Sequence, residues 1–172
     1  MWQGANRIQA DVIDLDREKR ILIANGKVIT NLWEEPKDPT EKAKKAAAAV
    51  MTEVRAPRLV YTEADRLAHY SGGAELKRPN LHVKAREIRA FLADADADSD
   101  SRLEKALADG AVTIFQTSPD RTRTGTSEHS EYYTDEQKIV LKGGMPKLVD
   151  TKSGTTVSPD GLTYWADDDR LL

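Results

Sequence analysis

The sequence has no cysteine, few aromatic residues and no long hydrophobic run. Without cysteine, a disulfide framework, a thiolate metal site and a cysteine nucleophile are all excluded. A cytosolic protein and a periplasmic one both remain compatible with this absence. No apolar run approaches the roughly 18–20 residues of a membrane-spanning helix, and no signal peptide is visible. We therefore expect no transmembrane segment in this chain.

Charge of one sign is not concentrated anywhere. The 172 residues include 26 Lys and Arg against 29 Asp and Glu, for a net charge of −3. Proteins that bind nucleic acid usually present a basic stripe to the phosphates, so we expect no nucleic-acid partner. Hydrophobic residues make up 39% and charged residues 32% of the chain. This composition supports a single domain over residues 1–172 with a thin, two-sided architecture.

Motifs of enzymatic chemistry are also missing. The sequence contains no GxSxG, no P-loop and no GxGxxG. His69, His82 and His129 are not at the spacing of metal ligands. His129 and Ser130 are adjacent, and adjacent strand residues point to opposite faces, so they cannot form a catalytic pair. We predict that the protein is not an enzyme and has no catalytic residue, no metal and no cofactor.

What the sequence does contain is a pattern that recurs four times. The first copy reads ADVIDLDREKRILIANGKV. Successive copies begin at Ala10, Ala56, Ala85 and Glu128. A glycine follows 16 residues later in three copies, at Gly26, Gly72 and Gly144, and 25 residues later in the third, at Gly110. Such self-similarity is typical of stacked supersecondary units.

Each copy predicts a strand, a polar turn, a second strand, a glycine turn and a third strand. The glycine positions suit tight turns with positive φ, and they are Asn25-Gly26, Gly72-Gly73, Asp109-Gly110 and Gly143-Gly144. The fold class we expect is all-β, built from repeated short antiparallel strands. Because the pattern starts and stops inside a copy, we expect the chain to be a fragment of a longer repeat protein.

Two segments interrupt the pattern. Residues 34–55 form a polar, Ala- and Lys-rich insertion, in which Asp38, Pro39 and Glu41 make a capping signal. A short helix or a disordered insertion at 38–54 is expected, either solvated or docked. The third copy contains ADADADSDS at the aspartate spacing of an EF-hand, but Ser99 and Lys105 stand where glycine and glutamate are required. This second insert is therefore predicted to be an acidic loop.

Alternation with period two assigns the inward faces of the strands. The inward candidates are Ile8, Ala10, Leu22, Ala24, Val28, Leu59, Tyr61, Val83, Ile88, Phe91, Val112, Ile114, Tyr133 and Leu141. By residue type alone they fit a packed sandwich core. The alternative is an under-filled interior, because aromatic residues are few. Such an interior would leave a slot for alkyl chains, lined by all of these candidates except Ala24 and Tyr61. Each methylene buried there would contribute roughly 0.8 kcal/mol.

Arg121 and Arg123 form a second candidate site. They lie two residues apart beside a turn, so on a strand both would face one side. Arginine forks match phosphate and carboxylate groups, so the pair could bind an anion. A solvated loop is the alternative.

The repeats resemble those of a known family. The segment IQADVIDLDREKRILIANGKVI is similar to the I-x-A-D … D … A-x-G-x-V repeat of the OstA-like (organic solvent tolerance) lipopolysaccharide-transport family of LptA and LptC. The segment APRLVYTEADRLAHYSGGAEL has the same cadence, and LTYWADDDRLL resembles the terminal unit. The third and fourth copies depart from it, with Ala85-Arg86 and Glu128-His129 in place of the Ala-Asp pair.

This resemblance implies a V-shaped β-jellyroll whose two sheets enclose an apolar groove. It also implies a periplasmic location and lipopolysaccharide or a similar lipid as ligand. The partners it implies are transport-bridge proteins, with further copies of the chain among the candidates, that add strands at the sheet edges. Two other functions compete: a β-solenoid-like scaffold with a fully packed core for protein docking, and a sugar-binding jellyroll. The last would need aromatic platforms, for which Trp2, Trp33 and Trp165 are too scattered.

Overall fold

The computed structural model describes residues 6–34, 50–93, 103–166 and 170–172. The all-β prediction is confirmed. The strands are β1 (Arg7–Gln9), β2 (Val12–Asp16), β3 (Ile21–Glu34), β4 (Val50–Thr62), β5 (Leu67–Arg78), β6 (Leu81–Leu92), β7 (Leu103–Ser118), β8 (Arg121–Tyr133), β9 (Lys138–Lys142), β10 (Lys147–Asp150), β11 (Gly154–Val157) and β12 (Leu162–Trp165). Within the described ranges there is no helix of the length and hydrophobicity needed to cross a membrane.

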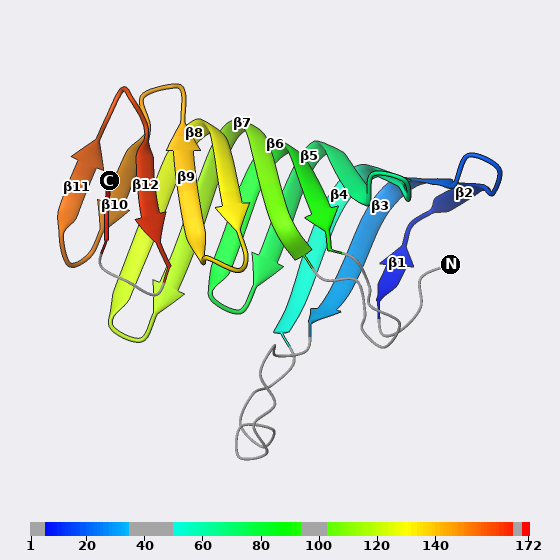
Figure 1. Cartoon of the computed structure of the whole chain (residues 1–172), viewed down its shortest axis with the longest axis horizontal. Helices are drawn as coiled ribbons and strands as arrows, with labels where there is room; N and C mark the ends of the chain where they lie inside the picture. Colours follow the sequence, from blue (N-terminus) through cyan, green and yellow to red (C-terminus); the bar gives the residue numbers. More distant parts are fainter. Residues whose placement is uncertain (1–5, 35–49, 94–102, 167–169) are drawn as a thin grey trace, which may run out of the picture.

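The strands form one antiparallel sheet that is folded over on itself. The order is β1-β3-β4-β5-β6-β7-β8-β10-β11, with β2 added to β3, β9 to β8 and β12 to β9. Figure 1 shows the strands side by side along the long axis, from β1 and β2 at one end to β10, β11 and β12 at the other. The result is a V-shaped β-jellyroll.

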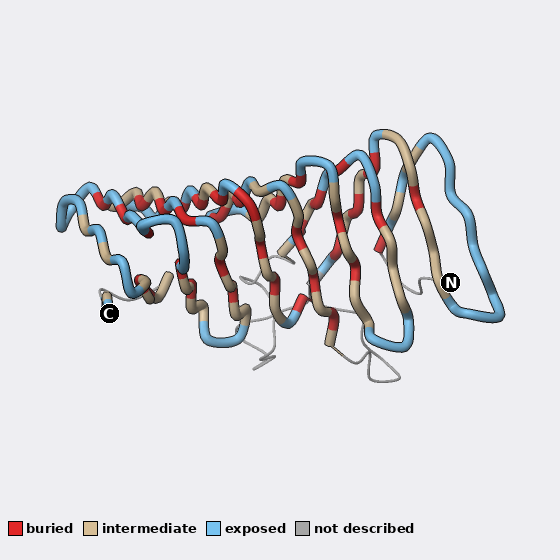
Figure 2. The backbone as a smooth tube through the Cα atoms, turned by 90° about the horizontal axis from the view of Figure 1, so that it is seen from above, coloured by how far each residue is buried: buried red, intermediate tan, exposed pale blue. Residues whose placement is uncertain are grey.

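Bulges divide the sheet into two layers. Layer one comprises β2, β9, β12 and residues 21–25, 58–62, 67–71, 87–92, 103–109 and 129–133. Layer two comprises β1, β10, β11 and residues 28–34, 50–55, 74–78, 81–84, 112–118 and 121–127. In Figure 2 buried residues recur along the strands of both layers. The apolar residues between the layers form one core.

The repeat glycines lie at the bend between the layers. Their positive φ values, such as +79° at Gly26 and +83° at Gly110, match the expectation. The expected tight turns are wrong at Gly26, Gly72 and Gly110, because these glycines lie inside β3, β5 and β7, where the register shifts. A bulge bends a strand without ending it, so one strand contributes to both layers.

The repeat pattern has a direct structural meaning at this bend. The second residue of each of the first three copies packs against a repeat glycine, in the pairs Asp11 with Gly26, Pro57 with Gly72 and Arg86 with Gly110, and in the fourth copy Glu128 packs in the same way against Gly144. The amide of Asp11 donates to the Gly26 carbonyl (2.9 Å), and the amide of Glu128 donates to the Gly143 carbonyl (3.0 Å). The fourth copy therefore begins at Ser127 and not at Glu128. With this register its opening pair is small-acidic, closer to the Ala-Asp pair of the first copy.

The hairpin turns fall in the polar segments between the strands. Backbone turns occupy residues 17–20, 63–66 and 134–137, and their last residues Arg20, Arg66 and Gln137 have positive φ. The helical or disordered insertion is wrong for residues 50–54, which belong to β4, since Thr52 and Val54 are buried in alternation with Met51 and Glu53. The rest of that insertion, and most of the acidic insert, lie outside the described residues.

Candidate functional site between the layers

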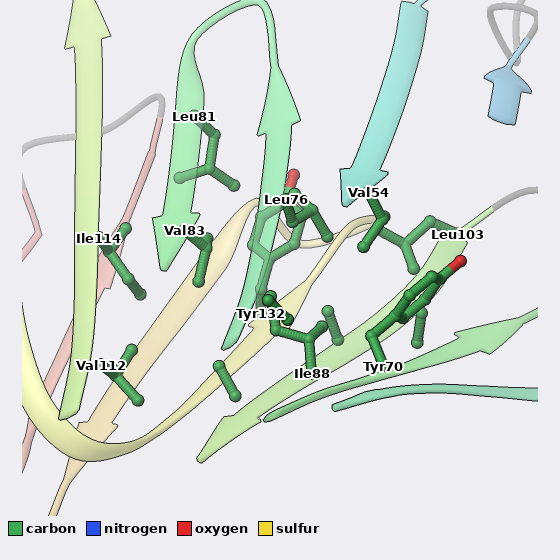
Figure 3. Close-up of a cluster of buried hydrophobic side chains, with 14 of the residues drawn as sticks. Val54, Tyr70, Leu76, Leu81, Val83, Ile88, Leu103, Val112, Ile114 and Tyr132 are labelled. Carbon is green, nitrogen blue, oxygen red and sulfur yellow. The ribbon is translucent and has the colours of Figure 1, made fainter. Parts of the chain in front are cut away.

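The space between the two layers is lined by small and aliphatic side chains from every long strand. Near the bend, layer one contributes Leu59, Tyr70 and Ile88, and layer two contributes Val112 and Ile114. In Figure 3, side chains such as Val83, Ile114 and Ile88 project into this shared space. Burial of a single aliphatic side chain contributes about 1.5–3 kcal/mol. The lining therefore contributes to stability and forms a continuous apolar surface between the layers.

Most of the groove residues predicted from the sequence line this interior. Seven of them are buried: Val28, Leu59, Val83, Ile88, Val112, Ile114 and Leu141. Ile8, Ala10 and Leu22 are partly buried and pack against the same core. Ala24 is buried in the core, and Tyr61 is partly buried and packs against the core.

Phe91 and Tyr133 lie on the outer face of layer one and not in the interior. Lys105 lies between them across the strands, with its ammonium 5.1 Å from the Phe91 ring centroid and 5.7 Å from that of Tyr133. In β8 the buried neighbours are Ser130 and Tyr132, which places Tyr133 on the opposite face. Phe91 likewise alternates with the buried Ala90 and Leu92. The expected inward orientation is therefore wrong at these two positions.

Three tyrosines that the sequence analysis did not assign to the interior fill much of it. Tyr70 and Tyr164 are fully buried, and Tyr132 is nearly so. Burial raises the pKa of the Tyr70 and Tyr164 hydroxyls. Beginning the fourth copy at Ser127 would have aligned Ser130 and Tyr132 with the inward Leu59 and Tyr61 of the second copy. That one-residue shift in the repeat was the missed signal for Tyr132.

The middle of the interior is closed among the described residues. The cavity bounded by Leu76, Val83, Ile88, Ile114 and Ile139 has a volume of about 10 Å³, room for about one water molecule. In this part of the interior, the described residues leave no open slot of the kind expected from the low aromatic content, since Tyr70 and Tyr132 are buried among the aliphatic side chains. An acyl chain could enter only after the layers separate.

A few contacts hold the layers together at the edge of the V opposite the bend. We call this edge the opening edge. The Arg78 guanidinium lies 5.8 Å from the Tyr132 ring centroid, and that of Arg123 lies 5.3 Å from Tyr164. The Gln116 side-chain amide donates to the Ala166 carbonyl (2.8 Å), and Arg123 Nη1 donates to that of Trp165 (2.6 Å). The apolar interior is thus closed on this side by polar, cation–π and hydrogen-bonding groups.

A second, larger cavity opens between the layers at the C-terminal end. It has a volume of about 270 Å³ and is lined by Arg121, Arg123, Leu148, Asp150, Lys152, Ser153, Tyr164 and Leu171. Arg121 and Arg123 do face one side, as expected from their spacing, and both bind Asp150. Arg121 Nε donates to both carboxylate oxygens (2.9 and 2.7 Å), and Arg123 Nε donates to Oδ2 (3.1 Å).

Electrostatics hold this cluster ionised. Burial alone would raise the pKa of the Asp150 carboxyl, but the hydrogen bonds from Arg121, the Lys152 amide and Arg123 hold that pKa below its usual value. Asp150 and Arg123 are both buried. A buried charge pair is maintained only where its remaining hydrogen bonds are satisfied, and here the amide of Lys152 also donates to Asp150 (2.8 Å).

The histidines lie on the outer faces beside carboxylates. His69 Nε2 lies 3.0 Å from Glu87, and His129 Nδ1 lies 2.6 Å from Asp109. His82 Nε2 lies 3.7 Å from Glu75. No group of three or more potential ligands that could hold a metal ion occurs among the described residues. These contacts are cross-strand pairs of the kind that stabilise a sheet.

A family model matches most of the chain. The family described as "LptA/(LptD N-terminal domain) LPS transport protein" matches residues 53–169. The crystal structure of LptH, the LptA homologous periplasmic component of the conserved lipopolysaccharide transport device from Pseudomonas aeruginosa, is similar at 12% identity with a TM-score of 0.47, over 99% of this chain and 82% of that chain. None of the curated proteins is a significant match. The matched family is one of transport components and not of enzymes. Because the match covers more than half of the chain, this protein belongs to the LptA/LptD N-terminal domain family of LPS transport proteins.

Proposed function

We propose that this protein is a periplasmic lipopolysaccharide-transport module that shields acyl chains between its two layers and passes them to a neighbouring protein. Membership of the LPS transport family carries the proposal. The continuous apolar lining between the layers supports it, since a chain held there makes no specific bond that must break at each step. The periplasmic location and the lipid are taken from the family.

Loading in this proposal requires the layers to part. The interior volume of about 10 Å³ is far below that of an acyl chain. Separation would break the opening-edge contacts, while the bulges at Gly26, Gly72 and Gly110 would act as the hinge. The burial of acyl methylenes, at roughly 0.8 kcal/mol each, would offset the loss of core contacts.

The ends of the sheet support transfer by strand addition. At the N-terminal end, Val12, Ile13 and Leu15 of the edge strand β2 are about half exposed. At the other end, Val157 of β11 and the terminal Leu172 are exposed. Unpaired edges with apolar side chains are templates for another strand. A head-to-tail stack, of this chain or of other bridge proteins, would cover both ends.

The test is lipid loading into variants of the interior. Val112→Asp places a charge on the lining and should abolish displacement of a fluorescent fatty acid by lipopolysaccharide. Thr113→Asp, on the outer face of the same strand, is the matched control and should load normally. Val112→Thr keeps the side-chain shape, so it remains informative if the aspartate variant unfolds, and its loading should fall several-fold.

A folded Val112→Asp or Val112→Thr variant that loads as the wild type does would contradict the proposal. The packed interior favours a docking scaffold as the second candidate. That function would be supported if lipopolysaccharide neither binds the wild-type protein nor changes its melting temperature.

A further inference from the structure

We propose that the C-terminal cavity binds the phosphate group of an amphiphile, with the alkyl chain directed into the space between the layers. We call this cavity, defined by Arg121, Arg123, Asp150, Lys152 and Tyr164, the C-terminal site. The inference rests on the proposed function, because it assumes that an acyl chain enters between the layers. It adds a charged recognition site at one end of an otherwise apolar path.

The charges of the lining favour an anion. Among the described residues, three cationic side chains and one carboxylate line the cavity. Arg121 and Arg123 are held by Asp150 in a fixed position, with their side chains only 10% and 4% exposed. Guanidinium groups fixed in this way are suited to the geometry of phosphate oxygens. Lys152 is more exposed and binds Asp120 at the rim, so it can turn toward a ligand at little cost.

A second observation points to a ligand. Tyr164 lines the same cavity, is fully buried, and its hydroxyl has no hydrogen-bond partner among the described residues. A buried hydroxyl without a partner destabilises the fold. A phosphate oxygen in the cavity would accept from this hydroxyl, and it would complete the cluster.

The walls of the cavity also favour an alkyl chain. Leu148 is part of the main core, and Leu171 packs against that core. Leu148 pairs with Gly125 of β8, which itself pairs with Ile114 deep between the layers. A phosphate at the arginines therefore lies at the mouth of the apolar interior. The volume of the C-terminal site, about 270 Å³, accommodates a phosphate together with the first part of an alkyl chain.

Binding of decyl phosphate, decyl maltoside and inorganic phosphate to the full chain tests the proposal. All three are titrated below the micelle concentration and followed by calorimetry. Decyl phosphate should bind at least about tenfold more tightly than decyl maltoside, because it alone makes charge-assisted hydrogen bonds. Inorganic phosphate should bind more weakly than decyl phosphate, because it has no chain to bury.

Variants of the C-terminal site make the test specific. Arg121→Gln should weaken decyl phosphate binding about tenfold or more and leave decyl maltoside unchanged. Lys152→Gln changes a side chain that binds Asp120 and leaves the backbone amide that donates to Asp150 in place, so it serves the same purpose if Arg121→Gln does not fold. Lys147→Gln, on the exposed face of β10, is the matched control and should bind as the wild type does.

Tyr164→Phe should change the melting temperature and the affinity for decyl phosphate in opposite directions. Removal of an unpartnered buried hydroxyl should raise the melting temperature of the free protein. The same substitution should weaken decyl phosphate binding several-fold. A purely structural tyrosine would not move the two measurements in opposite directions.

The outcomes separate this inference from the proposed function. Equal binding of the two amphiphiles, or unchanged decyl phosphate binding in Arg121→Gln and Lys152→Gln, would overturn the phosphate site and leave lipid transport standing. Inorganic phosphate binding as tightly as decyl phosphate would also overturn it, in favour of a free-anion site. Failure of both amphiphiles to bind would contradict both proposals.

Discussion

Single residues at the bend carry much of the geometry of this fold. Gly110 has a φ of +83°, and a β-carbon there would lie 2.8 Å from the β-carbon of Arg86. The next residue, Ala111, also has a positive φ, of +49°. Each bulge thus needs two successive residues in a conformation that glycine tolerates and other residues disfavour. The repeat supplies glycine at the more crowded of the two.

The two residues of this bulge should respond in opposite directions. Gly110→Ala should lower the free energy of unfolding by about 1–3 kcal/mol, because it adds both a steric contact and backbone strain. Ala111→Gly should raise it by about 0.5–1 kcal/mol, because Ala111 is exposed and loses only its strain. Urea unfolding of both variants measures these changes. A stabilising Gly110→Ala would show that the bend tolerates a side chain.

Glu131 on the outer face links stability to pH. Lys142 Nζ donates to it (2.9 Å) and the Tyr133 hydroxyl donates to it (2.5 Å). Hydrogen bonds from Lys142 and Tyr133 lower the pKa of Glu131 to about 2 from its usual 4.5. Because the folded pKa is depressed, this stabilisation is present above about pH 4.5 and is lost as the pH falls toward 2.

Glu131→Gln should therefore be less stable than the wild type at pH 7, by about 1–3 kcal/mol after allowance for solvent screening. The difference should shrink between pH 4.5 and pH 2. Chemical unfolding at several pH values measures it. Glu104→Gln, at an exposed position of β7, is the control. A difference between wild type and Glu131→Gln that does not change with pH would contradict the assignment.

At the scale of elements, the ends of the sheet differ from its middle. The central strands β3 to β8 are paired on both sides, whereas β2 pairs only with β3. The Arg20 carbonyl accepts from the Glu63 amide, so Leu22 and Ala24 direct their backbone groups to β4, and Ile23 and Asn25 direct theirs to β2. The amides of Ile13 and Leu15, which lie between the hydrogen-bonded positions of β2, therefore point to the free edge. This edge has the unpaired donors that strand addition requires.

Ile13→Pro should block strand addition while preserving the β2–β3 ladder, because the Ile13 amide points away from β3. Proline is tolerated on an edge where its missing N–H faces solvent. Sedimentation velocity over a concentration series should show weaker self-association for this variant than for the wild type. Ile13→Val, which keeps the amide, is the control. Equal association of Ile13→Pro and wild type would exclude this edge as the contact.

At the scale of the molecule, the closed interior sets the energetics of lipid binding. Ligand that binds only the folded state stabilises it by about 2.7 kcal/mol at a hundredfold excess over Kd. For a domain of this size that corresponds to a rise in melting temperature of about 5–10 °C. Parting of the layers would reduce this rise, since core contacts and opening-edge contacts are lost.

Saturating lipopolysaccharide should therefore raise the melting temperature of the wild-type protein by several degrees. Scanning calorimetry with and without the lipid measures the shift. The Val112→Asp variant, if folded, should show none, and Thr113→Asp should match the wild type. A wild-type protein whose melting temperature does not respond would remove the thermodynamic support for loading.

The sequence by itself determined the strand-rich repeats, the positive φ at the glycines and most of the inward residues such as Leu59 and Ile114. These follow from local alternation and from backbone sterics, which need no distant contact. Only the tertiary structure decided that the glycines bend strands and do not end them. It also decided that Tyr133 faces outward, because the alternation shifts by one residue in β8, where Ser127 and Ser130 are both buried. The outward position of Phe91 follows from period two alone, since Phe91 lies three residues from the buried Ile88. The filling of the interior and the capture of Arg121 and Arg123 by Asp150 depend on residues from separate strands that meet only in the folded sheet.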